Sequence, residues 1–175
     1  MPQLDVMEDK RRETWDEREL TDLYRQHVRY VGAIAQRILG QREDAEDVVQ
    51  DVFIDAQRGL SGIREPAAVR GWLATVTVRK ARRKLRIRTF RAAFGAGTAE
   101  PADVAAAGAS PEERAQVTRL YALLEHAPAN ERIAWVLRYL EGEKVEDVAT
   151  QCECSLATAK RWIARTHAML ERGMR

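Results

Sequence analysis

The sequence predicts an all-α fold made of two small helical domains joined by a flexible linker, with a helix-turn-helix in the C-terminal domain. Apolar residues recur at helical spacing over most of the chain, and capping residues and prolines mark where helical segments begin. One stretch rich in alanine and glycine interrupts this periodicity. We therefore expect a tail at 1–13, domains at 14–91 and 111–175, and the linker at 92–110.

The first domain contains three predicted helices. The first begins at a capping box formed by Thr14 and Glu17 and ends at Gly40. The second has acidic residues in its first turn and ends at Gly59, and Pro66 is well placed to begin the third. The second helix has the clearest apolar stripe, which consists of Ala45, Val48, Val49, Val52, Phe53 and Ala56.

The second domain begins with a helix N-cap at Ser110 and a proline, Pro111, at the first helical position. Pro128 begins another helix, which ends at Gly142. A short helix, a tight connection and a final helix capped by Ser155 then form a helix-turn-helix pattern. An ordinary helical hairpin with a solvated basic face is the alternative interpretation.

Positive charge is concentrated in one part of the chain. The formal net charge is only +2, yet residues 61–91 contain ten Lys or Arg against one Glu, and residues 78–91 contain eight and no acid. A helix anchored by Trp72 and Leu73 leads into this run and holds its charges in place, where they could contact successive phosphates. A solvated helix face is the alternative interpretation. Together with a second basic block at 151–175, the pattern favours a polyanionic partner.

Two sets of residues, one in each domain, resemble a known family. In the first domain the string DAEDVVQDVF at 44–53 is followed by Gly71, Trp72 and Leu73 and then by the basic helix. This arrangement resembles region 2 of bacterial RNA polymerase sigma factors of the extracytoplasmic function (ECF, group 4) type. The second domain is similar to region 4 of the same proteins, at Pro128, Arg132, Leu137, Gly142, Val148, Ala149, Ser155, Thr158 and Lys160.

The resemblance implies a function and a set of contacts. A sigma factor binds the RNA polymerase core enzyme, through its β′ and β subunits, and directs it to the −10 and −35 elements of promoter DNA, where transcription starts and the strands open. The residues implied to bind the core enzyme are Asp47, Gln50 and Asp51. Those implied to bind the −10 element are Arg64, Arg70, Arg79, Lys80, Arg82 and Arg83. Those implied to bind the −35 element are Ser155, Thr158, Lys160, Arg161 and Arg165, and an anti-sigma factor is a further candidate partner.

The chain departs from the family pattern in its helix-turn-helix. Glu153 stands where the family usually has the turn glycine. Either a glutamate takes this turn with some backbone strain, or the turn itself differs from that of the family. Trp162 stands where the family residue is usually small or polar, and it could pack on a neighbouring helix or on DNA. Cys152 and Cys154 match no structural zinc spacing, so we expect both to be buried apolar side chains.

Two other classes of protein fit the sequence less well. A free-standing helix-turn-helix regulator would explain the second domain but leaves the helix at 44–53 without a role. An enzyme could use Glu43, Asp47 and Asp51, which share a helix face, but no Glu-x-x-His motif accompanies them and no Gly-rich phosphate loop is present. We therefore predict a non-enzymatic protein with no catalytic residue, no metal site and no cofactor.

Composition and hydropathy indicate where the protein acts. The 175 residues are 45% hydrophobic and 32% charged, which suits a globular chain. The N-terminal residues lack the apolar stretch of a signal peptide, and no run of about 18 apolar residues is present. We therefore expect a cytoplasmic protein without membrane insertion.

Overall fold

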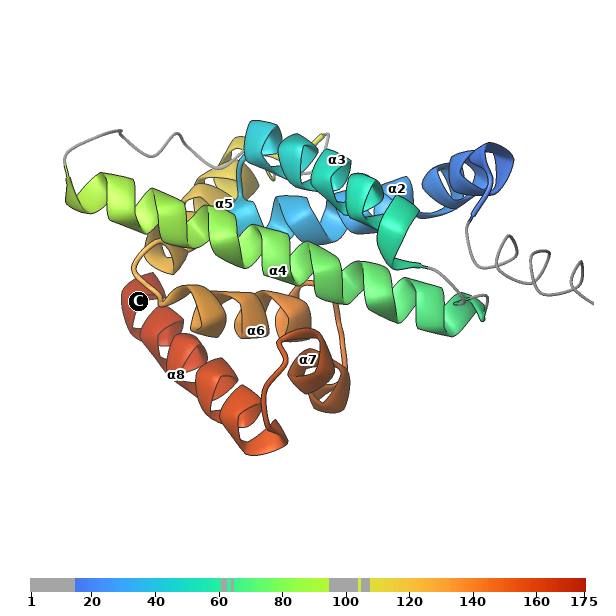
Figure 1. Cartoon of the computed structure of the whole chain (residues 1–175). Helices are drawn as coiled ribbons and strands as arrows, with labels where there is room; N and C mark the ends of the chain where they lie inside the picture. Colours follow the sequence, from blue (N-terminus) through green and yellow to red (C-terminus); the bar gives the residue numbers. More distant parts are fainter. Residues whose placement is uncertain (1–14, 61–62, 64, 95–103, 105–107) are drawn as a thin grey trace, which may run out of the picture.

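The structure is a computed structural model that describes residues 15–60, 63, 65–94, 104 and 108–175. This part of the chain forms seven helices and contains no strand, which confirms the predicted all-α fold (Figure 1). The helices are α2 (Glu17–Leu39), α3 (Arg42–Gly59), α4 (Pro66–Ala93), α5 (Pro111–Leu124), α6 (Ala129–Tyr139), α7 (Val145–Gln151) and α8 (Leu156–Met174). Among these helices, none has the length and apolarity that a membrane span requires.

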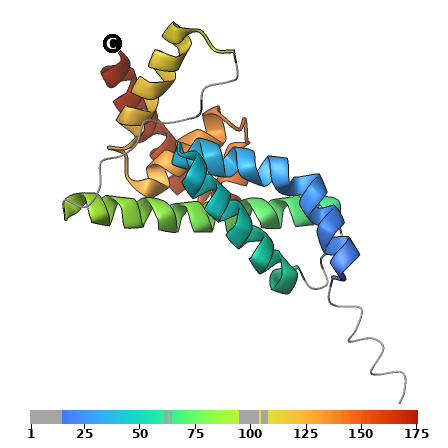
Figure 2. The same cartoon turned by 90° about the horizontal axis from the view of Figure 1, so that it is seen from above.

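In the first domain, α2, α3 and α4 pack against one another, and α2 and α3 both cross over α4 when the molecule is seen from above (Figure 2). Fully buried aliphatic side chains fill its centre, and burial of each contributes about 1.5–3 kcal/mol relative to exposure. They include Val31, Ile34 and Ile38 of α2, Val48 and Val52 of α3, and Leu73 of α4. The apolar stripe predicted for α3 therefore faces inward.

The ends of α2 show how local capping sets the helix boundaries. The predicted capping box of Thr14 and Glu17 was wrong by two positions, because Asp16 and Glu19 form it. The Asp16 carboxylate accepts from the Glu19 backbone N–H at 2.8 Å, and the Glu19 carboxylate accepts from the Asp16 N–H at 2.9 Å. Thr14 lies outside the described residues. Gly40 ends the helix as predicted, with a φ of 75° that favours glycine.

The longest helix, α4, runs between the other helices of the two domains. It has 28 residues, which corresponds to a length of about 42 Å. It contacts α2 and α3 on one side and α6 and α7 on the other (Figure 1). Its buried residues therefore do not form a single apolar stripe. The helix includes the whole basic run and also Ala92 and Ala93, which the sequence analysis assigned to the linker.

The second domain is built around α6, which contacts both α8 and α7. Six consecutive residues of α6, from Arg132 to Leu137, are buried. The chain then forms the predicted helix-turn-helix from α7, a tight turn and α8, with Ser155 as the N-cap of α8. Glu153 in this turn has a φ of 56°, so a glutamate does adopt the left-handed backbone that usually requires glycine.

The two domains contact each other directly, since α6 packs on both α2 and α4, and α7 packs on α4. Polar groups line this contact. Arg37 of α2 donates to the Leu140 carbonyl at 3.0 Å and to the Glu141 carboxylate at 2.8 Å. The Tyr121 hydroxyl of α5 donates to the Arg37 carbonyl at 2.7 Å. The position of one domain is therefore fixed by specific bonds to the other.

Candidate nucleic-acid interface

The N-terminal half of α8 presents polar and basic side chains at the start of a helix. Ser155 caps it, because its hydroxyl accepts from the Thr158 backbone N–H at 3.2 Å and also donates to the Thr158 hydroxyl at 2.9 Å. Lys160, Arg161 and Arg165 follow and are exposed, although Arg165 also contacts Glu131 of α6 at 3.3 Å. The structure thus places all five residues implied to bind the −35 element at the N-cap and in the N-terminal half of α8. The helix dipole favours phosphate at the first turn, beside Ser155 and Thr158.

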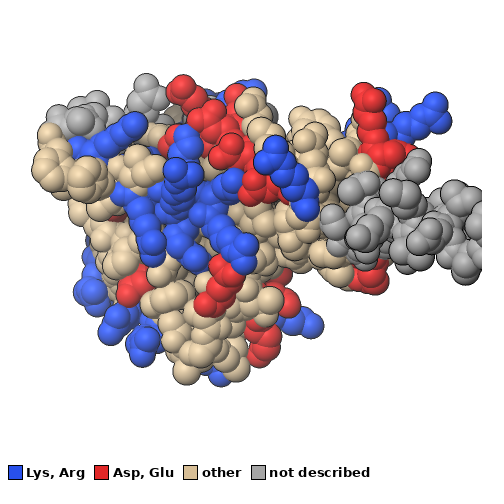
Figure 3. Space-filling view, viewed as in Figure 1, with Lys and Arg blue, Asp and Glu red and all other residues tan. Residues whose placement is uncertain are grey.

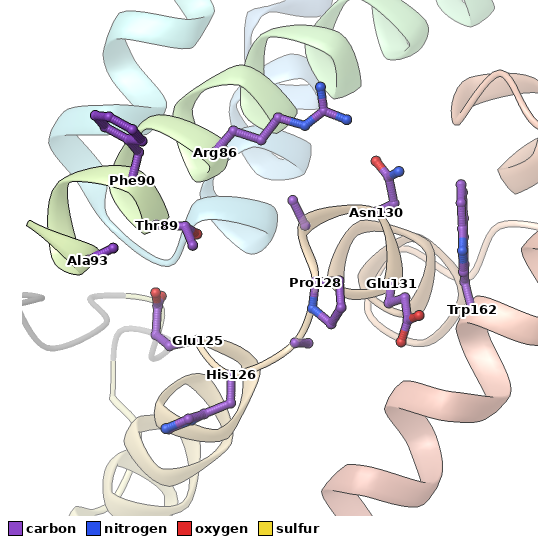
Figure 4. A pocket seen from close by; sticks show the side chains of 12 residues that line it. Arg86, Thr89, Phe90, Ala93, Glu125, His126, Pro128, Asn130, Glu131 and Trp162 are labelled. Carbon is purple, nitrogen blue, oxygen red and sulfur yellow. The ribbon is translucent and has the colours of Figure 1, made fainter.

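The sequence is compatible with two environments for the Trp162 side chain, a neighbouring helix or DNA. In the structure it is half-buried and lines a hollow between α8, the connection from α5 to α6, and the C-terminal half of α4 (Figure 4). Asn130, Glu131 and Arg86 line the same hollow. The indole therefore lies against the neighbouring helices of its own chain, and the structure favours the first of the two alternatives.

A second basic surface lies along α4 (Figure 3). Arg79, Arg83 and Arg86 are exposed, and Arg82 beside them is half-buried. Because a helix has 3.6 residues per turn, positions 79, 83 and 86 lie on one side of α4. We call the surface formed by Arg79, Arg82, Arg83 and Arg86 the α4 basic face. Arg86 is not among the residues that the resemblance implied, although its spacing of three from Arg83 and seven from Arg79 was a usable signal.

Other cations of the basic run point inward and connect helices. Lys80 pairs with Asp55 of α3 at 2.8 Å. Lys84 contacts Asp44 and Asp47 of α3 at 3.0 and 2.7 Å. The run therefore combines cations that hold the first domain together with cations that face solvent, and Lys80 belongs to the first group.

The remaining two residues implied for the −10 element do not join the α4 basic face. Arg70 lies about two and a half helical turns before Arg79, so the two side chains leave α4 on opposite sides. Its guanidinium stacks over the Tyr30 ring of α2, 3.9 Å from the ring centroid. Arg64 lies outside the described residues.

The α4 basic face is in contact with the helix-turn-helix. Arg79 forms a two-bond pair with Glu153, in which its Nε donates to Oε2 at 2.9 Å and an Nη donates to Oε1. This hydrogen bond raises the pKa of Arg79 and lowers the pKa of Glu153. An Nη of Arg82 donates to the Cys152 carbonyl at 2.9 Å. Two of the four arginines therefore bind the turn between α7 and α8.

A buried arginine anchors the other end of the domain contact. Arg132 is only 1% exposed, and it donates to the Ile38 and Leu39 carbonyls at 2.8 and 3.0 Å and to the Glu125 carboxylate at 2.7 Å. Arg88 of α4 donates to the same Leu39 carbonyl at 2.9 Å and also to Glu125. Burial alone would raise the pKa of Glu125, but the charges and hydrogen bonds of both arginines lower it overall. The C-terminal end of α2 is thus capped by cations from both domains.

Acid is expected to weaken both of these contacts. The pKa values of Glu125 and Glu153 lie below their ordinary value of 4.5 in the folded protein. The stability that they contribute is present above pH 4.5 and is lost as the pH falls through the lowered values. Urea denaturation at neutral pH and at about pH 3.5 should therefore show a smaller pH-dependent loss for a Glu125→Gln, Glu153→Gln variant than for the native chain. An equal loss in the two proteins would contradict this prediction.

An acidic surface lies on α3. Asp47, Gln50 and Asp51 are exposed, as the resemblance implied, although Asp47 is also paired with Lys84. Ile54 is 52% exposed and follows them on the same side of the helix. The sequence analysis did not name Ile54 as part of this surface. The available signal was that Ile54 is apolar but does not belong to the apolar stripe of the same helix. The three residues thus lie beside an exposed apolar side chain, and polar groups next to an apolar one are typical of a protein-binding surface.

The two cysteines lie at the turn of the helix-turn-helix. Cys152 is 3% exposed, and burial raises the pKa of its thiol to about 12. Cys154 is half-buried, and burial raises its pKa as well. Both thiols are therefore protonated at neutral pH. Within the described ranges, no group of three or more His, Cys, Asp or Glu side chains could hold a metal ion.

The fold is that of a two-domain, all-helical protein of the helix-turn-helix class. The Sigma-70 region 2 family matches residues 23–91, and the Sigma-70, region 4 family matches residues 118–170. The ECF RNA polymerase sigma factor SigM of Mycobacterium tuberculosis is 31% identical over 150 residues, which cover 86% of this chain and 74% of SigM. The chain belongs to the ECF RNA polymerase sigma factors.

Two further comparisons agree with this family. The RNA polymerase sigma-H factor of Pseudomonas aeruginosa is 28% identical over 148 residues, which cover 79% of this chain and 77% of that protein. The solved structure of the sigma factor RpoE in complex with the anti-sigma factor NepR from Bartonella quintana has the same fold, with a TM-score of 0.69 and 21% identity over 88% of this chain and 95% of that one. The protein is thus a promoter-recognising sigma factor of RNA polymerase, and the region 2 match disfavours a free-standing regulator.

Proposed function

We propose that this protein is a group 4 sigma factor in which α3 binds the core enzyme, the α4 basic face contacts the −10 element and α8 reads the −35 element. It acts in the cytoplasm, without catalysis, metal or cofactor. The observation that carries this proposal is the separation of charge on two neighbouring helices. Exposed acidic residues precede Ile54 on one side of α3, whereas the exposed side of α4 carries arginines at positions 79, 83 and 86.

The two DNA contacts differ in kind. Arginines along one side of a helix suit successive phosphates, which position a protein on DNA without reading its sequence. The α8 residues Ser155, Thr158, Lys160, Arg161 and Arg165 lie where a recognition helix contacts base edges in the major groove. We therefore assign sequence recognition mainly to α8 and docking of the backbone mainly to α4.

An anti-sigma factor is a further proposed partner. The RpoE protein of Bartonella quintana, which has the same fold, is described in complex with the anti-sigma factor NepR. A chain with separate surfaces for polymerase and for DNA offers such a partner two surfaces to cover. Co-purification of the protein from its own cells would identify this partner.

Run-off transcription with purified bacterial core enzyme tests the proposed function. The template is the DNA upstream of this protein's own coding region and of neighbouring genes, assayed with and without the protein. We expect a transcript with a defined start that depends on the protein. Failure to produce a transcript and to co-purify with core enzyme, combined with a shift of duplex DNA, would instead identify a free-standing regulator.

Charge reversal on α3 tests the core-binding surface. Asp51→Arg is expected to weaken binding to core enzyme about tenfold, which is about 1.4 kcal/mol, because it places a cation on an acidic docking surface. Asp51 suits this experiment better than Asp47, whose reversal would also repel Lys84. Competition with a labelled sigma factor for core enzyme measures the effect. Glu171→Arg on α8 is the control, because it changes the net charge by the same amount. Equal losses of affinity for core enzyme in the two variants would contradict the assignment of the core-binding surface to α3.

A further inference from the structure

Arg165 differs from the other cations in the N-terminal half of α8 in having an acidic partner. One Nη of its guanidinium donates to the Glu131 carboxylate of α6 at 3.3 Å. Lys160 and Arg161 form no ion pair with an acidic side chain in the described part of the chain. The direction of these two side chains is therefore set by α8 alone, whereas the Arg165 guanidinium is attached to a second helix.

The Glu131 carboxylate is held in place by its surroundings. It lies in the first turn of α6, and the six residues that follow it in this helix are buried in the centre of the second domain. Its own side chain is only 15% exposed, and it lines the same hollow as Trp162 (Figure 4). The Arg165 side chain, by contrast, is 63% exposed. The pair thus joins a fixed carboxylate to a guanidinium that reaches solvent.

This ion pair sets the direction of the Arg165 guanidinium. Arg161 lies four positions earlier, so the two cations are neighbours on one side of α8 and repel each other. Glu131 binds one Nη, and the other N–H groups of the planar fork remain available to DNA. An arginine reads guanine through two parallel hydrogen bonds to O6 and N7, which require one orientation of the fork. Glu131 therefore restricts the orientation of Arg165 while leaving it donors for a base.

The same carboxylate acts against the competing contact with phosphate. An acid beside a guanidinium offsets part of its positive charge, and the acid also repels a phosphate directly. A base edge carries no net charge, so its hydrogen bonds are weakened less. Specific recognition commonly combines an attractive contact with a repulsive one of this kind. Glu131 thus disfavours binding of Arg165 to the DNA backbone more than binding to a base.

We propose that Glu131 is a positioning residue that directs Arg165 to a guanine of the −35 element and away from phosphates, so that it determines specificity at one base pair. This inference rests on the proposed function, which assigns the −35 element to α8. An acid in the first turn of α6 also suits the dipole of that helix. That structural role alone predicts no effect confined to one base pair, so the two roles differ in a measurable way.

The test selects DNA with the full chain bound to core enzyme. The probe is a pool of duplex fragments of random sequence, and the fragments retained through repeated rounds of filter binding are sequenced. Arg165→Ala identifies the base pair that Arg165 reads, as the position at which the preference for guanine falls. Glu131→Gln keeps the shape of the side chain but removes its charge. It should lower the preference for guanine at that same base pair about fivefold, the lower end for one bidentate contact, and leave the other positions unchanged.

Two controls separate positioning of Arg165 from a general change in charge or stability. Glu146→Gln removes the same charge from the first turn of the neighbouring helix α7, and it should change every base preference by less than about twofold. In an Arg165→Ala background, Glu131→Gln should have no further effect at the identified base pair, because the two residues act through one contact. A loss of preference spread over all positions, an effect of Glu131→Gln that persists without Arg165, or no position affected by Arg165→Ala would overturn the proposal.

Binding to a duplex of scrambled sequence provides a second measurement. Release of Arg165 from Glu131 gives it one phosphate contact, so Glu131→Gln should tighten this binding about fivefold at about 0.15 M salt. Fluorescence anisotropy of the labelled duplex with holoenzyme measures the change. Equal affinities of the Glu131→Gln and Glu146→Gln variants would show that Glu131 does not keep Arg165 from phosphate.

Failure of this inference is distinguishable from failure of the proposed function. If the native holoenzyme selects a sequence motif and the Glu131→Gln holoenzyme selects it with the same preferences, only the role of Glu131 fails. If the native holoenzyme selects no motif, the assignment of the −35 element to α8 fails, and the role of Glu131 fails with it.

Discussion

Arg83→Ala combined with Arg86→Ala is expected to weaken promoter-complex formation about 30-fold at about 0.15 M salt. Both side chains are exposed on the α4 basic face, and among the described residues neither forms a hydrogen bond or ion pair with the helix-turn-helix. Each lost phosphate contact lowers the salt dependence of binding by about 0.9, and two lost contacts at this salt concentration give the expected factor. Because phosphate contacts carry no sequence information, promoters of different sequence should be affected alike.

Filter binding of holoenzyme to a promoter fragment over a range of salt concentrations measures this effect. Arg172→Ala, at an exposed position near the end of α8, is the control within the same chain. The affinity for core enzyme should be unchanged in the double variant, because the core-binding surface that we propose lies on α3. A salt dependence equal to that of the native protein would show that the two arginines do not contact phosphate.

Arg132→Ala is expected to lower the free energy of unfolding by about 3 kcal/mol, the lower end of the range for breaking a buried ion pair. The guanidinium is almost fully buried, and its removal leaves the Ile38 carbonyl without its donor. Arg88 still donates to the Leu39 carbonyl and to Glu125, which is why the lower end applies. The melting temperature should fall by about 6–12 °C.

Urea denaturation followed by tryptophan fluorescence provides the measurement for Arg132. The control is Arg138→Ala in the same helix, where the side chain is exposed and the expected change is within about 0.5 kcal/mol. A loss smaller than about 1 kcal/mol for Arg132→Ala would show that water replaces its bonds, as happens at exposed ion pairs.

The helix ends were predictable where one local signal stood alone. Ser110 is the N-cap of α5 as predicted, in a capping box with Glu113, and Gly40 ends α2 with a positive φ. The start of α2 was wrong because two overlapping patterns, Thr14 with Glu17 and Asp16 with Glu19, both satisfy the rule for a capping box. Only the three-dimensional course of the chain selects between them.

The roles of the individual cations were less predictable than their number. The sequence shows eight Lys or Arg at 78–91, but which of them face solvent depends on how α4 packs against other helices. Lys84 points to α3, whereas Arg79 meets Glu153, a residue 74 positions later in the chain. No local pattern encodes a contact over that separation. The sequence alone therefore could not show which cations of the basic run pair with other helices and which face solvent.

The pairing of Arg79 with Glu153 constrains how this sequence can change over evolutionary time. Under the proposed function, a substitution at position 79 alters two properties together, the affinity for phosphate and the attachment of the second domain. A replacement of Glu153 by glycine would relax the turn but release its arginine partner. Neither position can change independently without altering the attachment of the turn between α7 and α8 to α4. Relatives that lose the acid at 153 are therefore expected to have changed the base at 79 as well, so that the two positions co-vary across the family although they lie in different domains.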